Sequence, residues 1–283
     1  MGEAKRKKIV GTSAVRRGEL LRRFERLQID PSMPGFYDDP KFLVEERRDR
    51  LFLESYAEWV IHRERSPEYD DHVRAVMAKL APIISARLDR HQWFGACIAV
   101  TGMVTRILDR LGVWNVVMRG SVGLRTPDGG SRHFRIVDED EGRGSETGHY
   151  WLVVPPFDIV DLTLHHQRWI AGDEKYQAIA PKILLAEETD VVQAQADDVI
   201  APAMLRSGLA AEIHRHLPDQ KRFSAIVPAR RVALDGLELR YVASGSTAPD
   251  APLEGINSGG RTGVPAIQIW NEDVVPAFGI VSR

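Results

Sequence analysis

The sequence predicts an α+β fold in which a helical N-terminal region precedes an antiparallel sheet. Residues 13–28, 40–65 and 67–88 carry apolar side chains at helical spacing. After residue 113 the pattern changes to short β-branched runs at 114–119, 133–137, 149–154 and 158–164. The last two runs flank Pro155-Pro156-Phe157, a suitable turn between paired strands. Helices followed by strands are the order expected of an α+β domain.

The first 30 residues are interpreted as a basic N-terminal tail and an amphipathic helix. Residues 1–26 contain nine Lys or Arg side chains and three Glu side chains. We expect residues 1–12 to form a flexible tail and residues 13–28 a helix capped by Ser13, with a stripe of Leu20, Leu21, Phe24 and Leu27. The breaker-rich segment 30–35 then separates this part from the core.

The core is expected to span residues 31–243, and residues 244–283 to form a loop-rich C-terminal extension. Gly, Ser and Pro dominate residues 244–264, as in a long loop or linker. Residues 200–217 have a helical pattern that ends before Pro218, and the apolar residues 266–270 suggest a last strand.

The composition indicates a soluble, cytoplasmic, bacterial-type protein. The 283 residues are 43% hydrophobic and have a net charge of −2, which favours neither nucleic acid nor a membrane. No apolar run approaches the ~18 residues of a membrane helix. The lone cysteine excludes an intramolecular disulfide and suits a reducing compartment. The basic run Lys5–Lys8 lacks interleaved aromatic residues, so we expect no nucleic acid, and an acidic partner for this arm stays open.

That lone cysteine, Cys97, is placed as a nucleophile would be. It follows the small residues Gly95 and Ala96 and begins an apolar helical run, 97–111. A thiolate at the first turn of a helix is stabilised by the positive end of the helix dipole. Small neighbours allow a substrate backbone to approach, and local N–H groups can stabilise an oxyanion.

A base and an orienting acid follow in the predicted hairpin. His149 begins the first strand, and Asp161 lies in the second. If residues 155–157 form a three-residue loop, Val154 faces Asp158, and Asp161 is a diagonal neighbour of His149, roughly 7–8 Å away. Asp158 would then lie at the opposite end of the hairpin, about 16 Å along the strand. Asp161 is therefore the better partner, although a one-residue slip in register would reverse its facing.

The chain resembles the transglutaminase-like branch of the papain-like cysteine enzymes over residues 93–165. The residues that carry the resemblance are Gly95-Ala96-Cys97 opening a helix, Arg110-Leu111-Gly112-Val113 ending it, His149-Tyr150-Trp151 on one strand and Val160-Asp161-Leu162-Thr163 on the next. The chain departs from the family pattern at Trp114, where proline is common. The resemblance implies a transglutaminase-like α+β core with Cys97 as nucleophile, His149 as base and Asp161 as orienting acid.

Three residues before the cysteine are candidates for oxyanion stabilisation or substrate binding: Gln92, Trp93 and Gly95. In papain-like enzymes a Gln shortly before the cysteine helps to form the oxyanion hole, so the resemblance extends this role to Gln92. No cofactor is expected. The pairs His165-His166 and His214/His216 lack further ligands at metal spacing, so no metal site is expected and both pairs are interpreted as solvated.

These observations predict a cysteine-dependent acyl-transfer enzyme, either a hydrolase (peptidase or amidase) or an acyltransferase of the transglutaminase-like type. Its substrate would be a peptide, amide or thioester. Two alternatives stay open. One is an arylamine N-acetyltransferase relative that uses acetyl-CoA, although the surround expected of that class, R-G-G-x-C-x-E, is absent at Trp93–Cys97. The other is a non-enzymatic partner-binding protein that retains the fold and uses its triad only for packing.

Overall fold

The computed structural model describes all residues except 1–2, 139–147, 209–211, 258–263 and 281–283, and the side chains of residues 3–12 also lie outside it. The basic run Lys5–Lys8 and most of the acidic segment 138–148 therefore lie outside the described side chains. No helix in the described ranges is long and apolar enough to span a bilayer.

Helices make up the first part of the chain, as the apolar spacing predicts. They are α1 (Glu3–Leu27), η1 (Phe36–Asp38), α2 (Pro40–Arg48), η2 (Arg50–Phe52), α3 (Leu53–His62), α4 (Pro67–His91) and α5 (Cys97–Arg110). Asp39 and Ser66 cap α2 and α4 with their side chains. The expectation of a flexible tail over residues 1–12 is wrong, because α1 already begins at Glu3. Ser13 is thus inside the helix, where its hydroxyl contacts His62 Nδ1 at 3.2 Å.

A curved antiparallel sheet forms the centre of the molecule. Its order is β5-β4-β3-β1-β8-β7-β6, and β2 pairs with the outer half of β1. The strands are β1 (Val116–Arg125), β2 (Ser131–Phe134), β3 (His149–Val154), β4 (Phe157–Asp161), β5 (Leu184–Ala186), β6 (Asp190–Val191), β7 (Arg230–Leu234) and β8 (Leu237–Thr247). Helices and antiparallel strands in this order confirm the α+β class.

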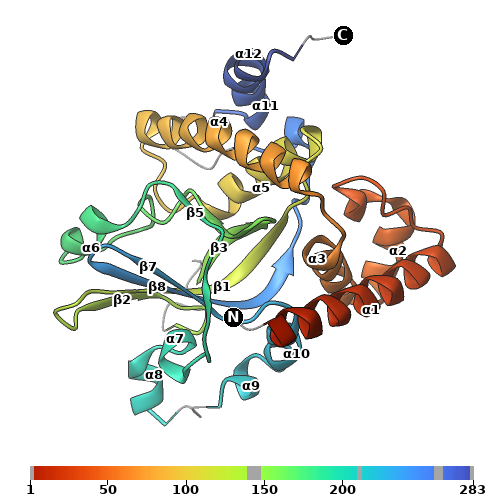
Figure 1. Ribbon diagram of the computed structural model, residues 1–283. Helices are drawn as coiled ribbons and strands as arrows, with labels where there is room; N and C mark the ends of the chain where they lie inside the picture. Colours follow the sequence, from red (N-terminus) through yellow and green to blue (C-terminus); the bar gives the residue numbers. More distant parts are fainter. Residues whose placement is uncertain (1–2, 139–147, 209–211, 258–263, 281–283) are drawn as a thin grey trace.

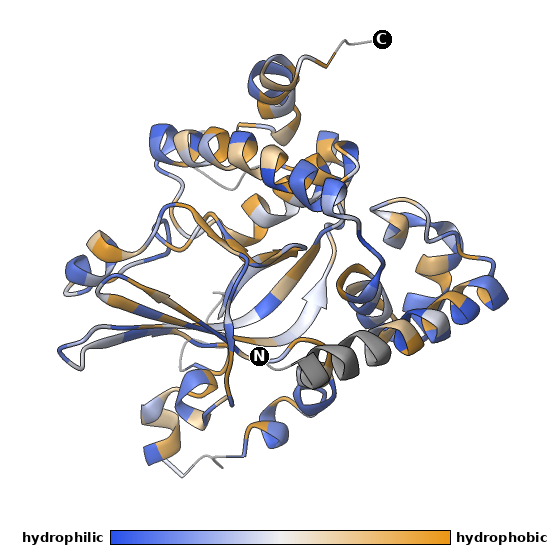
Figure 2. Ribbon diagram, viewed as in Figure 1, coloured by the Kyte–Doolittle hydropathy of each residue, from blue (hydrophilic) through white to orange (hydrophobic). Residues whose placement is uncertain are grey.

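Helices cover the sheet on both sides (Figure 1). On one side α4 and α5 pack against alternate residues of β1 and β3, with Val117, Tyr150 and Leu152 in the shared core. On the other side α1, α3 and α10 (Gln220–Ile226) pack against the intervening residues, which include Met118 and Trp151. Figure 2 shows the apolar and polar residues alternating along α4, as burial of one helix face requires. Both faces of β3 are therefore buried, and the whole strand is enclosed.

The secondary structure of the C-terminal third departs from the expectations in two places. Residues 200–217 do not form one helix, because only α8 (Pro202–Arg206) and α9 (Ile213–His216) are helical within the described part. Residues 266–270 are helical instead of extended: α11 (Ala266–Ile269) runs into the π-helical turn Trp270–Val274 and α12 (Val275–Phe278). The remaining short helices are α6 (Glu174–Ile179), α7 (Ala196–Val199) and η3 (Leu253–Gly255).

The boundary expected at residue 243 falls inside β8. This strand pairs with β1 as far as Thr247, opposite Val117. Beyond it, the carbonyls of Pro249 and Ala251 accept hydrogen bonds from Arg106 of α5, which is buried. The composition of this segment is loop-like, but its first residues complete the sheet and the next ones cover α5.

Candidate functional site

The hairpin β3–β4 brings His149 and Asp161 into contact. His149 Nε2 lies 2.6 Å from Asp161 Oδ2, and both side chains are fully buried. The expected three-residue loop is wrong: Val154 pairs with Phe157 across a two-residue turn. A bulge then restores the expected register, because Leu152 pairs with Val160. Asp161 thus follows on the same face as His149, two residues displaced along β3.

Asp158, the rejected candidate, lies at the turn end of the hairpin. It pairs with Arg230 at 3.1 Å and accepts a hydrogen bond from Thr189 Oγ1 at 2.8 Å. The two aspartates of β4 therefore have separate partners, one at each end of the strand.

The buried carboxylate of Asp161 is fully supplied with hydrogen-bond donors. Oδ1 accepts from the N–H groups of Thr163 at 2.9 Å and Leu164 at 3.1 Å, and from the Thr163 hydroxyl at 3.2 Å. Oδ2 accepts from His149 and from the hydroxyl of Tyr241 on β8 at 2.8 Å. Burial alone would raise the pKa of Asp161, but the charge and hydrogen bond of His149, with these donors, hold it below its ordinary value. The group is therefore ionised at neutral pH.

Cys97 completes the cluster from the first turn of α5. Its thiol lies near the imidazole of His149 and contributes to raising the pKa of that ring. Burial alone would lower the pKa of His149, but the Asp161 carboxylate, its hydrogen bond to the ring and the nearby thiol raise it to about 10. The ring therefore carries a proton and a positive charge at neutral pH, next to the only thiol in the chain. Cys97 is buried, with 8% of the residue exposed, and His149 is completely buried.

Gln167 holds the second nitrogen of the ring. Its side-chain amide Nε2 lies 2.8 Å from His149 Nδ1, and it also reaches the Thr163 carbonyl at 3.4 Å. Since Nε2 of His149 bonds to Asp161 and Nδ1 contacts Gln167, both ring nitrogens have a partner, and together the two contacts fix the plane of the ring.

The segment before α5 brings the sulfur close to the ring. Gly95 has φ = 68°, in the left-handed region, and its N–H donates to the His166 carbonyl at 2.7 Å. A Cβ at this position would collide with the side chain of Arg168, so only glycine fits. This N–H is already bonded and is not a free oxyanion donor. The first-turn N–H groups of α5, from Cys97 to Ala99, have no acceptor in their own helix and no side-chain cap.

Gln92 and Trp93 do not have the positions that the sequence suggested. Gln92 is exposed, ends α4 with φ = 52°, and donates its amide to the Asp89 carbonyl at 3.0 Å. Its side chain thus caps its own helix instead of reaching Cys97. Trp93 is buried in the core beside α4 and α5, where its ring stacks on His91 with centroids 5.4 Å apart.

The neighbouring histidine pair is structural in part. His166 is buried and bonds to Asp89 at 3.0 Å, and Lys182 pairs with the same carboxylate at 2.8 Å. The expectation that this histidine is solvated is therefore wrong. Within the described ranges, no cluster of three or more His, Cys, Asp or Glu side chains is arranged to hold a metal ion.

No protein-family model matches this chain, and no curated protein or solved structure shows significant similarity to it. The resemblance to the transglutaminase-like enzymes accordingly depends on the residues of 93–165 alone. What the arrangement can do must be inferred from its geometry.

Local sequence pattern does not point to two members of the cluster, Tyr241 and Gln167. Tyr241 reaches Asp161 from a strand 80 positions later in the chain. Gln167 lies in the segment 165–169, whose histidines are its most conspicuous residues. Its position four residues after Asp161-Leu162-Thr163 is the one feature of the sequence that connects it with the site.

Proposed function

We propose that this protein is a cysteine-dependent acyl-transfer enzyme on a transglutaminase-like core, with Cys97 as nucleophile, His149 as general base and Asp161 as the group that orients the ring. One observation carries the proposal: a fully buried imidazole bonds to a carboxylate through one nitrogen and contacts the only thiol of the chain. Nucleophile, base and orienting acid in hydrogen-bonding sequence are the signature of activated nucleophiles.

The chemistry proceeds in two balanced steps. In the reactive state the thiol proton of Cys97 resides on His149, whose pKa of about 10 keeps the ring protonated at neutral pH, and the sulfur lone pair attacks the substrate carbonyl carbon, whose π electrons move to oxygen. Collapse of this adduct breaks the bond to the leaving group, which takes the proton from His149, and leaves a thioester on Cys97. Water or an amine, deprotonated by His149, then attacks the thioester and restores the thiol. Water gives hydrolysis, and an amine gives acyl transfer.

Two features support a carbonyl substrate at this position. The N–H groups in the first turn of α5, which begins at Cys97, have no acceptor in their own helix and no side-chain cap, so they are available to stabilise the oxyanion. The flanking side chains Phe94 and Ile98 are both 43% exposed, although they are large and apolar. Exposed apolar side chains so close to Cys97 along the chain favour an acyl group with a hydrophobic substituent over acetyl, which weakens the arylamine N-acetyltransferase alternative.

The lone cysteine permits a direct test. The protein is incubated with p-nitrophenyl acetate or p-nitrophenyl hexanoate, and acylation is followed by p-nitrophenol release and by the intact mass. Any adduct labile to hydroxylamine at neutral pH reports on Cys97. We expect acylation of the wild type, faster with hexanoate, and its loss in Cys97→Ala and in His149→Gln.

The matched controls are the urea-unfolded chain and Thr105→Ser, a conservative change at a buried position on α5. The proposal is refuted if the folded wild type acylates no faster than the unfolded chain, or if His149→Gln acylates as fast as the wild type. Either result would favour the partner-binding alternative, in which the triad only packs.

A further inference from the structure

A cleft of about 510 Å³ lies between α1, α3 and the segment that precedes β1. The two helices pack side by side (Figure 1). An engineered apolar cavity of about 150 Å³ holds benzene, so a cleft of this volume has room for about twenty non-hydrogen atoms. Most of its lining residues are apolar: Ala14, Gly18, Leu21, Pro31, Trp59 and Trp114.

One cation in this lining has no counter-ion. Arg63 forms no ion pair with a carboxylate in the described part of the chain, and its Nη1 is buried without a hydrogen bond. Burial lowers the pKa of Arg63, and the nearby Tyr69 and Asp70 offset this effect only in part. Asp70 pairs with Arg65 instead, at 3.2 Å. A partly buried charge without a partner is costly and rare in native proteins, so an anion is the missing element.

The surroundings of Arg63 hold its guanidinium in place. Its central carbon lies 4.7 Å from the ring centroids of both Tyr69 and Trp114, and these cation–π contacts supply no acceptor. The other two charges of the lining cancel, because Arg17 pairs with Glu64 at 3.3 Å. One positive charge therefore remains. A planar guanidinium fixed in this way can bind a carboxylate through two parallel N–H bonds.

The walls beside this charge are suited to an aromatic ring. Trp59 lines the cleft, and its buried indole N–H has no hydrogen-bond partner among the described residues. Leu21, on α1, is 39% exposed although it is large and apolar. Ligand sites typically combine such an apolar and aromatic lining with a few placed polar groups. The cleft thus favours a ligand with a ring and one negative charge.

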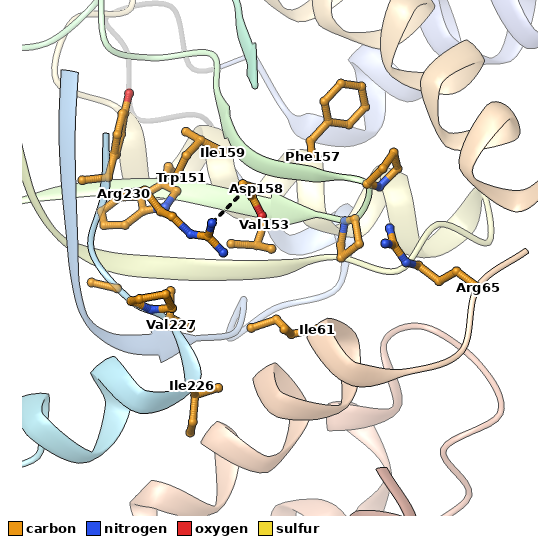
Figure 3. A pocket seen from close by; sticks show the side chains of 15 residues that line it. Ile61, Arg65, Trp151, Val153, Phe157, Asp158, Ile159, Ile226, Val227 and Arg230 are labelled. Atoms are coloured by element: carbon orange, nitrogen blue, oxygen red, sulfur yellow. Dashed lines mark ion pairs between the residues drawn. The ribbon is translucent and has the colours of Figure 1, made fainter. Parts of the chain in front are cut away.

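The cavity between the sheet and α3 offers no comparable group (Figure 3). Its charged lining residues are all paired: Arg230 with Asp158 at 3.1 Å, the dashed contact in Figure 3, and Arg65 with Asp70 at 3.2 Å. This cavity is also smaller, at about 100 Å³. It therefore serves as an internal control for the cleft.

We propose that the cleft binds an aromatic monocarboxylate of about ten to twenty non-hydrogen atoms, whose carboxylate pairs with Arg63 and whose ring packs against Trp59 and Leu21. A monoanion matches the single uncompensated charge better than a dianion such as a phosphate monoester. None of the lining residues belongs to the proposed triad, so the site is independent of the proposed function.

The test is a calorimetric titration of the full-length protein with 2-naphthoate. We expect saturable binding. The neutral analogue 2-naphthamide should bind about tenfold more weakly or worse, because it cannot form the charged pair with a guanidinium. The dianion 2-naphthyl phosphate should also bind more weakly than 2-naphthoate.

Two variants address the residues that carry the proposal. Arg63→Met removes the charge and should weaken binding of 2-naphthoate about tenfold or more, while binding of the amide changes less than about twofold. Gly18→Leu should abolish binding of both, since its side chain enters the cleft from α1. A Cβ at Gly18 meets only the end of Arg22, and leucine is the better helix former, so this variant should be at least as stable as the wild type.

The matched control is Arg26→Met, which removes a positive charge from an exposed position of α1 outside the lining. It should bind 2-naphthoate as the wild type does.

The indole N–H signals of the ¹⁵N-labelled wild type locate the ligand without any change in the cleft. Trp59 and Trp151 both have a buried indole N–H without a partner in the described residues, but Trp151 lines the cavity of Figure 3. The two signals are assigned from their loss in Trp59→Phe and Trp151→Phe. On titration with 2-naphthoate, the Trp59 signal should shift with saturation and the Trp151 signal should stay in place.

Any one of five results would overturn the proposal: no saturable binding, equal or tighter binding of the amide or the phosphate, unchanged binding in Arg63→Met, unchanged binding in Gly18→Leu, or a shift of Trp151 without one of Trp59. These results are separate from those for the proposed function. If 2-naphthoate binds as expected while Cys97 cannot be acylated, the enzyme proposal fails and the cleft stands as a ligand site. The reverse result leaves the enzyme proposal in place and removes this one.

Discussion

Replacing Asp161 by Asn tests the orienting carboxylate with the smallest change in shape. In Asp161→Asn the amide oxygen can still accept from the N–H groups of Thr163 and Leu164. The amide NH₂ then faces His149 Nε2, so this nitrogen must accept a hydrogen bond instead of donating one. The ring proton moves to Nδ1, which can no longer take the thiol proton of Cys97.

The size of the effect follows from this change of tautomer. The corresponding Asp-to-Asn change in a serine protease lowers kcat by about 10⁴-fold. A thiol needs less help from a base, so we expect Asp161→Asn to acylate about 10²- to 10⁴-fold more slowly, or about 3–5 kcal/mol in activation free energy. Asp161→Ala leaves two buried N–H groups without an acceptor and should lose about 2–6 kcal/mol of unfolding free energy in addition.

The assay is the initial rate of p-nitrophenyl hexanoate acylation, with urea unfolding measured on each variant. Asp158→Asn is the matched control, because this aspartate lies three residues earlier on the same strand and pairs with Arg230 at a partly exposed position. It should change the acylation rate less than threefold and the unfolding free energy by about 1 kcal/mol or less. If Asp161→Asn is folded and acylates within threefold of the wild type, Asp161 does not orient the base.

Four further changes have defined outcomes. Because the pKa of His149 rises to about 10 in the folded chain, its stabilising contribution is complete below about pH 6.5 and is lost toward pH 10. The unfolding free energy of His149→Gln should therefore be lower than that of the wild type by about 5 kcal/mol at most, and this difference should shrink between about pH 6.5 and pH 10. Burial raises the pKa of Asp109 to about 7, so the unfolding free energy falls by up to about 4 kcal/mol as the pH rises from 4 to 7. Asp109→Asn should therefore be more stable than the wild type at about pH 8 but not at about pH 4. Gly95→Ala, with positive φ and a Cβ that meets Arg168, should lower the unfolding free energy by about 1–3 kcal/mol and slow acylation. Tyr241→Phe should cost about 1–2 kcal/mol in urea unfolding and slow acylation a few-fold, since the carboxylate loses one donor.

Local pattern was sufficient to predict the hairpin and its aspartate. Alternation of side chains along a strand is fixed, so the choice of Asp161 over Asp158 needed only an approximate register. The turn itself was mispredicted, and a bulge between Leu152 and Val154 compensated for the error. The start of α5 at Cys97 was also predictable, because apolar spacing defines a helix of that length.

Contacts between distant segments were not predictable. Gln92 was favoured on its distance from Cys97 along the chain, but the end of α4 places its side chain on Asp89. The apolar run 266–270 suggests a strand but forms a helix, because so short a run fits a buried helix equally well. Tyr241 lies on β8 and Gln167 in the loop after β4, and both reach the site through tertiary contacts. No rule based on spacing along the sequence predicts contacts between segments so far apart.

The burial of the site explains why so many donors surround one carboxylate. Moving a charged pair out of water costs several kcal/mol per ion unless hydrogen bonds replace the lost hydration. Five interactions with Asp161 meet that need, and two of them come from backbone N–H groups directly after β4. A His–Asp pair retained only for packing would be less costly as two apolar side chains of similar volume. The protein instead buries the charged pair completely and supplies it with hydrogen-bond donors, which is the cost that the proposed role of His149 as a base would explain.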